Sequence, residues 1–226
     1  TKNFIKNYKK HEIENKLIIL PPYVYIYDFY QKIKGYQNIS LGAQDLFCEE
    51  NGAYTGKISG KMIKSLGCRY ALIGHSECRQ FEDQKNISKK INIAIKNSLI
   101  PFVCFGEYLD EKKRSLIFLK DQVKKSFDKV EETIETLFIA YEPIFSIGTG
   151  IVPKNQEINE NISIIKETLE ELKLLNVQDC KFFYGGSCNE KSVLELCKID
   201  ILDGFLIGGA SIKLNSIFEI LKILNE

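Results

Sequence analysis

The sequence of 226 residues contains no tryptophan, one methionine, two histidines and five prolines, and it has almost no net charge. It contains 31 Lys and Arg residues against 30 Asp and Glu residues, which leaves a formal charge of +1. Such a balance argues against nucleic acid or an anionic membrane as the binding partner. With 44% hydrophobic and 27% charged residues, the chain has the composition of a globular domain that buries its own core.

Long apolar segments are also missing. The apolar stretch at 17–27 is interrupted by Pro21 and Pro22 and is too short to cross a bilayer. The first residues, TKNFIKNY, lack the apolar core of a signal peptide. We therefore expect a cytoplasmic protein that does not contact membranes.

The cysteines form no recognisable metal or disulfide pattern. Their number is odd and no C-x-x-C pair occurs, which argues against a structural zinc site and against a disulfide framework. We expect them to be mostly small buried apolar residues. The seven positions are Cys48, Cys68, Cys78, Cys104, Cys180, Cys188 and Cys197.

Short apolar runs alternate with longer helical patterns along the whole chain. Most of the runs are continuously apolar, as is typical of parallel strands that are covered on both faces. The eight predicted strands are Asn3–Lys6, Leu17–Leu20, Ile39–Ala43, Tyr70–Ile73, Pro101–Phe105, Phe138–Tyr141, Phe182–Tyr184 and Gly204–Ile207. The predicted helices are Asn86–Asn97, Asp110–Glu132, Glu157–Leu175, Ser192–Cys197 and Leu214–Leu224. This alternation favours an α/β fold, a closed (β/α)₈ barrel in a single domain over residues 1–226.

One interval is too short for such a barrel. Only eleven residues lie between Lys9 and Pro21, and they must hold both a crossover and the second strand. A parallel crossover needs about a dozen residues or more. The sequence therefore predicts a first helix that is short or missing, or residues absent after Lys9.

The first candidate site follows the predicted strand Tyr70–Ile73. The sequence LIGHSE places a glycine turn, then His75, then a helix that begins near Ser76. The positive end of a helix dipole disfavours the charged form of an imidazole. A lone histidine is more often a structural or capping residue, but barrel enzymes build their sites at this end of the strands.

The second candidate is Glu142, at the end of an apolar strand. A partly desolvated carboxylate in this position is a candidate general base, although a surface ion pair explains a single strand-end Glu equally well. The segment 143–153 that follows has a proline at each end and contains Gly148 and Gly150. That composition is typical of a lid that moves on two hinges.

Two glycine pairs follow the last two predicted strands, in YGGS (184–187) and GFLIGGAS (204–211). Backbone without side chains lets amide N–H groups converge on an anion. The corresponding loops of barrels are the usual phosphate-binding site. One glycine pair is usually just a turn, but two pairs in these loops predict a phosphate site.

Taken together, the motifs resemble the triosephosphate isomerase family. They occur in the family's order, with near-family spacing from Gly42 onward, so the resemblance covers almost the whole chain. Jointly they are far more specific than any one alone. The segments are NYK (7–9), GAQ (42–44), ENGAYTG (50–56), IGHSE (73–77), AYEP (140–143), IGTG (147–150), YGGS (184–187) and GGAS (208–211).

The resemblance implies an isomerase of glycolysis and gluconeogenesis that interconverts dihydroxyacetone phosphate and glyceraldehyde 3-phosphate. Glu142 would be the base, and His75, as a neutral imidazole, would polarise the carbonyl; this pairing and the closing lid are the family's known arrangement. Lys9 would place a positive charge near the substrate, with Asn7 beside it. No cofactor or metal is implied.

The resemblance also implies supporting roles. Glu77 would act close to His75 and Lys9, and Ser76 and Cys104 would support the site. The N–H groups that would hold the phosphate belong to Gly148, Ser187, Gly208 and Gly209. The loop 49–56 resembles the family's intersubunit loop, which predicts a homodimer.

Two aromatic replacements depart from the family pattern, because Tyr8 and Phe145 stand where Trp is usual. Lys10 and His11 follow Lys9 in place of an apolar and an amide residue.

Two other hypotheses about the function remain open. One is a barrel that binds its ligand but has lost activity, and the other is a different phosphate-binding barrel, such as an indole-pathway enzyme or a sugar-phosphate epimerase. The lid-like segment after Glu142 argues against the second hypothesis, because a different barrel enzyme is not expected to have it.

Overall fold

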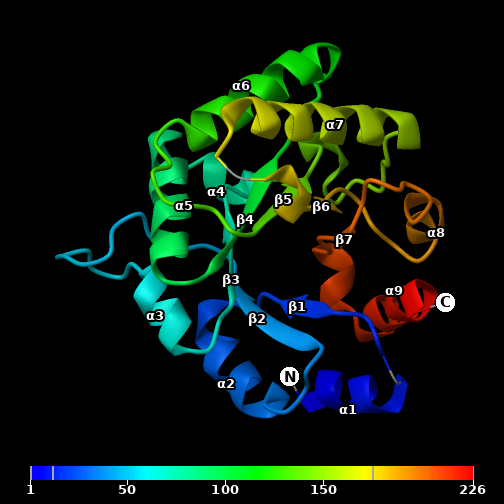
Figure 1. Ribbon diagram of the computed structural model, residues 1–226. Coiled ribbons are helices and arrows are strands. Elements are labelled where there is room, and N and C mark those ends of the chain that lie inside the picture. Colours follow the sequence, from blue (N-terminus) through cyan, green and yellow to red (C-terminus); the bar gives the residue numbers. More distant parts are fainter. Residues whose placement is uncertain (1, 12, 175, 226) are drawn as a thin grey trace.

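A computed structural model describes residues 2–11, 13–174 and 176–225 (Figure 1). Its centre is a curved sheet of parallel strands that pair in chain order, from β1 to β7. The helices lie around the outside of this sheet (Figure 1). The strands are β1 (Leu17–Ile19), β2 (Ile39–Ala43), β3 (Tyr70–Ile73), β4 (Ile100–Phe105), β5 (Leu137–Tyr141), β6 (Cys180–Tyr184) and β7 (Gly204–Phe205).

The helices and short 3₁₀ turns connect successive strands, as a parallel sheet requires. The helices are α1 (Lys2–His11), α2 (Tyr23–Ile33), α3 (Gly60–Ser65), α4 (Ser76–Arg79), α5 (Lys85–Lys96), α6 (Ser115–Phe127), α7 (Asn155–Leu172), α8 (Ser192–Leu196) and α9 (Leu214–Asn225). The 3₁₀ turns are η1 (Lys112–Arg114), η2 (Ile144–Ser146), η3 (Val177–Asp179) and η4 (Gly209–Ile212). Among the described residues, no helix has the length and apolar character needed to cross a bilayer.

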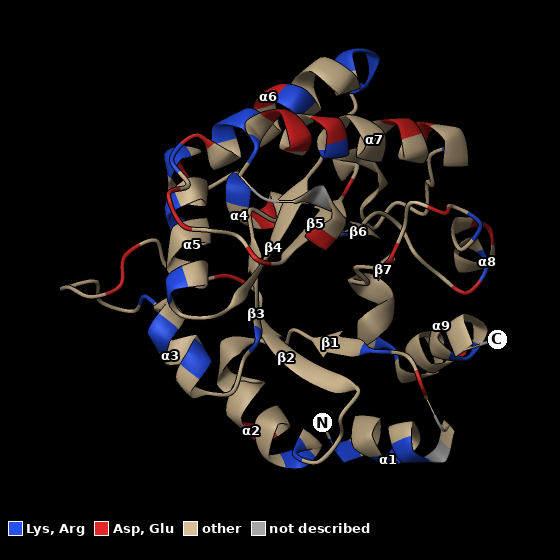
Figure 2. Cartoon of the chain, viewed as in Figure 1, with Lys and Arg blue, Asp and Glu red and all other residues tan. Residues whose placement is uncertain are grey.

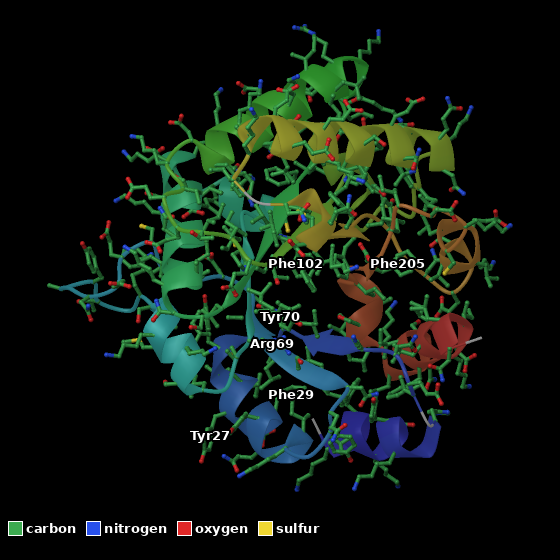
Figure 3. All side chains as sticks on the ribbon, in the orientation of Figure 1. Tyr27, Phe29, Arg69, Tyr70, Phe102 and Phe205 are labelled. Carbon is green, nitrogen blue, oxygen red and sulfur yellow. The ribbon has the colours of Figure 1, made fainter. Side chains whose placement is uncertain are left out.

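Side chains of the sheet form two apolar layers. Because neighbouring residues of a strand point to opposite faces, alternate positions separate into an outer and an inner cluster. In β4, Val103 and Phe105 belong to the outer cluster beneath the helices, and Phe102 and Cys104 belong to the inner one. The inner cluster also contains Leu72 of β3 and Ala140 of β5, with further aromatic rings packed against it. Figure 3 labels Phe102 in this central region.

Charged residues lie mainly on the helices and loops, with both signs interspersed, while the strands are nearly free of them (Figure 2). The ion pairs of Glu171 illustrate this surface, since its carboxylate lies 2.6 Å from Lys120 Nζ and 3.1 Å from Lys124 Nζ and so joins α7 to α6. Exposed pairs of this kind contribute little to stability. They do explain how 27% charged residues coexist with an apolar sheet.

The prediction of a strand at Asn3–Lys6 is wrong, because these residues belong to α1. Phe4 and Tyr8 are one helical turn apart and lie on the same face. The Phe4 ring lies 5.4 Å from Phe218 of α9 and 6.5 Å from Phe29 of α2, which is labelled in Figure 3. Tyr8 packs edge-on against Tyr36 at 5.6 Å. Burial of this aromatic face stabilises the helix. The four residues predicted as a strand are too few to show the helical period of apolar side chains.

Between α1, which ends at His11, and β1, which begins at Leu17, the described residues form no further helix. This agrees with the prediction that the helix after Lys9 is short or missing. The sheet has seven strands in the described part of the chain, one fewer than predicted, and β1 and β7 are its two edges. The α/β barrel class is nevertheless confirmed by the order and direction of these strands.

The other predicted strands match the structure to within a few residues. The predicted helix Asp110–Glu132 is shorter and comprises η1 and α6, and the predicted end of α7 at Leu175 lies outside the described residues. Helix α2 was not predicted. Its sequence, YVYIYDFYQKI, is dominated by aromatic and β-branched residues, which favour strands when judged alone.

Candidate active site

Strand alternation places Glu142 on the inner face of the sheet. Phe138 and Ala140 of β5 contribute to the inner cluster, and Glu142 follows at the next position of the same parity. Its N–H donates to the carbonyl of Phe105, 2.8 Å away, which extends the pairing of β5 with β4 by one residue. Glu142 is only 1% exposed, so its carboxylate is almost completely removed from bulk solvent.

Glycines that follow the two neighbouring strands make room for the backbone and the Cβ atom of Glu142. A Cβ atom at Gly106, after β4, would lie 1.8 Å from the carbonyl oxygen of Glu142. A Cβ atom at Gly185, after β6, would lie 3.1 Å from the Cβ of Glu142. The backbone of Glu142 can approach β4 this closely only because position 106 has no side chain.

The two carboxylate oxygens of Glu142 have different surroundings. Oε2 accepts the N–H of Ser76 at 3.1 Å and lies 3.7 Å from Nε2 of His75. Oε1 is buried and has no hydrogen-bond partner among the described residues. Burial raises the pKa of Glu142, while His75, the Cys104 thiol and the Ser76 amide lower it in part. An unpaired, desolvated oxygen of this kind can accept a proton.

His75 caps the short helix α4 and is held in one tautomer by the contact it makes there. Its Nδ1 accepts the N–H of Glu77 at 3.3 Å. Nδ1 therefore carries no hydrogen, and the neutral ring carries its single N–H on Nε2, the nitrogen nearer to Glu142. This geometry points a hydrogen-bond donor toward the carboxylate side of the site.

The turn between β3 and His75 is braced by Arg79, a residue that the motifs did not single out. Gly74 has φ +70°, a conformation that favours glycine. The guanidinium of Arg79 donates from Nε to Gly74 O and from Nη2 to Cys104 O, both at 2.9 Å. Burial lowers the pKa of Arg79. Its side chain thus ties the His75 turn to β4, and only the fold brings the three residues together.

The supporting residues predicted near His75 lie there. Ser76 binds Glu142 through its N–H, and Glu77 binds His75 through its own N–H, although the Glu77 side chain is 79% exposed. Cys104 is fully buried, and burial raises the pKa of its thiol well above the ordinary value, with the Glu142 carboxylate as the next cause. Cys104 therefore remains a neutral thiol beside the carboxylate rather than a nucleophile.

Lys9 and Asn7 are not brought to this site. Both lie on α1, which packs with α2 and α9 at the outside of the sheet (Figure 1). Lys9 is exposed, and the Asn7 side chain donates to Asn3 O of its own helix at 2.8 Å. The structure therefore does not bring Lys9 and Asn7 to Glu142 and His75, because the aromatic face of α1 holds them in a helix outside the sheet.

The predicted phosphate-binding residues follow three neighbouring strands. Gly148 lies in the lid segment after β5 and adopts φ +70°, and Ser187 follows β6. Gly208 and Gly209 are exposed at the start of η4, after β7. Because the strands are parallel, these loops lie at the same end of the sheet as Glu142 and His75.

The lid segment (residues 143–153) is bonded to the loop after β6. The N–H of Gly150 donates to Ser187 Oγ at 3.0 Å, and Ser187 Oγ donates to Ser146 O at 2.5 Å. The N–H of Ser187, predicted to bind phosphate, donates to Ser146 Oγ at 3.1 Å. The fold therefore brings the lid and the YGGS motif together, which the sequence could not show.

Behind the site lies a buried polar network that the sequence did not predict. The Tyr141 hydroxyl donates to Oε1 of Glu107 at 2.9 Å, and the Asn161 amide donates to that hydroxyl at 2.6 Å. Oε2 of Glu107 is buried without a hydrogen-bond partner among the described residues, and burial raises the pKa of Glu107. The carbonyl of Glu107 accepts the N–H of Ile144 at 3.0 Å, so the network also fixes the first turn of the lid.

The space beside Glu142 is small. A cavity of about 10 Å³ borders Gly74, Ser76, Cys104 and Glu142. In the part of the chain that the structure describes, no group of three His, Cys, Asp or Glu side chains is arranged to hold a metal ion. The groups gathered at this end of the sheet are a desolvated carboxylate, an imidazole ring and glycine-containing loops.

The chain is similar to known proteins in both sequence and structure. A family model described as triosephosphate isomerase matches residues 1–224. The triosephosphate isomerase of Dictyoglomus turgidum is 38% identical over 98% of this chain and 92% of its own length. That of Dictyoglomus thermophilum is 39% identical, over 98% of this chain and 90% of its own.

The structural comparison agrees with the sequence comparisons. The crystal structure of triosephosphate isomerase from Bartonella henselae has a TM-score of 0.86 and 27% sequence identity, and the match covers 100% of this chain and 94% of that one. The chain therefore belongs to the triosephosphate isomerase family of aldose–ketose isomerases.

Proposed function

We propose that the chain interconverts dihydroxyacetone phosphate and glyceraldehyde 3-phosphate, with Glu142 as the base and His75 as the electrophile. The observation that carries this assignment is a buried carboxylate beside an imidazole. One carboxylate oxygen has no hydrogen-bond partner among the described residues, and the other lies 3.7 Å from the imidazole nitrogen. The family membership of the chain supports the reaction, and the geometry supports the two roles.

The reaction moves a proton between two carbons beside a carbonyl group. A hydrogen on such a carbon is weakly acidic, so its removal needs a positioned base and stabilisation of the enediolate that forms. Glu142 takes the proton, because burial raises its pKa and makes it a stronger base than an exposed glutamate. It returns the proton to the neighbouring carbon, which completes the isomerisation without a cofactor.

His75 acts on the oxygens of the same two carbons. Its Nδ1 is occupied by the N–H of Glu77, so the N–H at Nε2 is the group that donates to a substrate oxygen. A neutral imidazole can give this proton to one oxygen and recover a proton from the other. The cap at Nδ1 and the brace of Arg79 keep the ring oriented for that exchange.

The phosphate group of the substrate is bound by backbone amides after β5, β6 and β7. We assign this role to the N–H groups of Gly148, Ser187, Gly208 and Gly209, because glycine-rich backbone lets several amides reach one anion. Binding energy from the phosphate, remote from the reacting carbons, favours closure of the lid. A closed lid excludes water and protects the enediolate.

One observation favours a second candidate, a barrel that binds a phosphorylated ligand without turning it over. Lys9 lies on α1 and not beside Glu142, so the positive charge that the resemblance assigned to it is not placed at the site. Lys9 and Asn7 therefore have no part in the proposed mechanism. Under the second candidate, purified protein binds a phosphoglycolate-like analogue and turns nothing over.

A coupled assay with glyceraldehyde 3-phosphate on the purified protein separates the two candidates. Turnover that is inhibited by a phosphoglycolate-like analogue supports the isomerase. Binding of the analogue with turnover no faster than that of Glu142→Gln would favour the inactive barrel. Glu142→Gln is the control in both arms, because it keeps the volume of the side chain and removes the base.

We also propose that the protein is a cytoplasmic homodimer. The loop 49–56 projects from the body of the molecule, and residues 50–57 are exposed (Figure 1). Beside this loop, a hollow of about 420 Å³ is lined in part by Phe47, Tyr54 and Met62. Exposed aromatic residues on a projecting loop are typical of an intersubunit contact. Light scattering on the purified protein gives its mass, and a monomer at micromolar concentration would contradict the dimer.

A further inference from the structure

Ser146 joins the lid segment to the loop after β6. It is the last residue of η2 and is fully buried, although its side chain is polar. Its Oγ contacts the Ile151 carbonyl, lies 3.1 Å from the Tyr184 hydroxyl and lies 3.1 Å from the N–H of Ser187. A buried hydroxyl with three polar partners is a junction that holds these segments in a defined arrangement.

The direction of each hydrogen bond follows from the chemistry of the groups. A serine hydroxyl has one hydrogen to donate and two lone pairs to accept with. The Ile151 carbonyl can only accept, so the hydrogen of Ser146 goes to it. The Tyr184 hydroxyl and the Ser187 N–H must then both donate to Ser146 Oγ. Every hydrogen-bonding capacity of this hydroxyl is used.

Gly186 lets the hydroxyl groups of Tyr184 and Ser146 lie close to the backbone of the loop after β6. A Cβ atom at this position would lie 2.2 Å from the Tyr184 hydroxyl and 2.8 Å from Ser146 Oγ. The two hydroxyl groups therefore pack directly on bare backbone of the loop after β6. Their position relative to the Ser187 N–H, one residue further along, is fixed by this contact.

The Ser187 N–H has one hydrogen, so its present acceptor and a phosphate oxygen compete for it. We propose that Ser146 is a positioning residue whose hydroxyl oxygen holds the Ser187 amide in competition with a phosphate ester oxygen. This inference rests on the proposed function, which assigns the Ser187 N–H to phosphate. When phosphate takes the N–H, Ser146 keeps its bonds to Ile151 and Tyr184, and the lid remains attached.

The test is the affinity for inorganic phosphate, measured by calorimetry and as a competitive inhibition constant. In Ser146→Ala the competing oxygen is gone, and phosphate should bind about two- to tenfold more tightly, which is the range of one hydrogen bond. Ser146→Cys should shift the affinity in the same direction, because a thiol is a weak acceptor. Ser146→Thr restores a hydroxyl oxygen and should return the affinity toward that of the wild type.

Two further variants separate competition from loosening of the lid. Tyr184→Phe removes a donor to Ser146, and Ser187→Ala removes the Oγ that bonds the lid, but neither frees the Ser187 N–H from Ser146 Oγ. Both should increase proteolytic cleavage within residues 143–153, and neither should bind phosphate more tightly than the wild type. A merely structural role of Ser146 predicts increased cleavage in all the variants and tighter phosphate binding in none.

Phosphate affinity in Ser146→Ala that equals or falls below the wild-type value would overturn the inference. A wild type that binds no phosphate would overturn the phosphate site of the proposed function, and this inference with it. A wild type that binds phosphate but has no isomerase activity would refute only the catalytic assignment. Calorimetry would still decide the competition at Ser187 in that case.

Discussion

Nε2 of His75 lies 3.7 Å from Oε2 of Glu142, although the two residues are 67 positions apart in the chain. This distance is too long for a hydrogen bond and short enough for both groups to reach one small molecule. Adjacent residues hold each side chain in place, since Ser76 donates to Glu142 and Glu77 donates to His75. The pair is therefore arranged by the first turn of α4.

Shortening the side chain of the base by one methylene should slow the reaction without changing the fold. In Glu142→Asp, the carboxylate retreats by roughly 1 Å, a displacement that can cost about 10²-fold in rate. We expect kcat to fall by about that factor, with an unchanged circular dichroism spectrum. Glu135→Asp, at an exposed position, is the matched control. Wild-type kcat in Glu142→Asp would remove Glu142 from its role as base.

Removal of the charge at Lys9 should have little effect on ligand binding. Lys9 is exposed on α1, outside the sheet, so Lys9→Met should bind a phosphoglycolate-like analogue as the wild type does. Isothermal titration of the analogue measures this directly. Loss of binding in Lys9→Met, but not in Lys6→Met on the same helix, would show that Lys9 reaches the ligand in solution.

Arg79 should matter for both stability and activity. In Arg79→Ala, the carbonyls of Gly74 and Cys104 lose their donor, and an unpaired buried polar group costs about 1–3 kcal/mol. We expect a drop of about that size in the free energy of unfolding, measured with urea, together with a lower kcat because His75 is no longer braced. Arg114→Ala, at an exposed site, is the comparison. Equal effects in the two variants would contradict the role of Arg79.

The buried carboxyl of Glu107 should make stability depend on pH. Burial raises its pKa in the folded state, so its favourable contribution is complete below the ordinary glutamate pKa and is lost as the pH rises through the folded-state pKa. Glu107→Gln should remove this loss and flatten the decline in unfolding free energy above about pH 4.5. Urea denaturation across a pH series measures how the unfolding free energy of each protein changes with pH. The same pH dependence in Glu107→Gln and in the wild type would refute the prediction.

The motifs predicted the strand-end and turn positions of several candidate residues, because each of these features is local. The glycine turn after β3 and the step from an apolar strand to Glu142 are both visible within a few residues of sequence. In the structure, Gly74 adopts φ +70° in that turn. The same holds for Gly208 and Gly209 at the start of η4. Residues that act through contacts distant in the chain, such as Arg79 with Cys104, leave no such signal.

The NYK segment shows the opposite case. Three residues matched the family motif, but the identity of a segment as helix or strand depends on what its side chains bury. Phe4 and Tyr8 bury their rings against Phe218 and Tyr36, and this contact makes residues 2–11 a helix. The resemblance of a tripeptide carries no information about that partner.

The sequence by itself determined the alternation of strands and helices, the strand-end positions of His75 and Glu142, and the glycine pairs of the last two loops. Local backbone preference and apolar periodicity are enough for these, because they act within a few residues. Only the tertiary structure decided the tautomer of His75, the place of Lys9 on an outer helix and the partner of the Ser187 N–H. Each of these depends on a specific contact that forms only when the chain is folded.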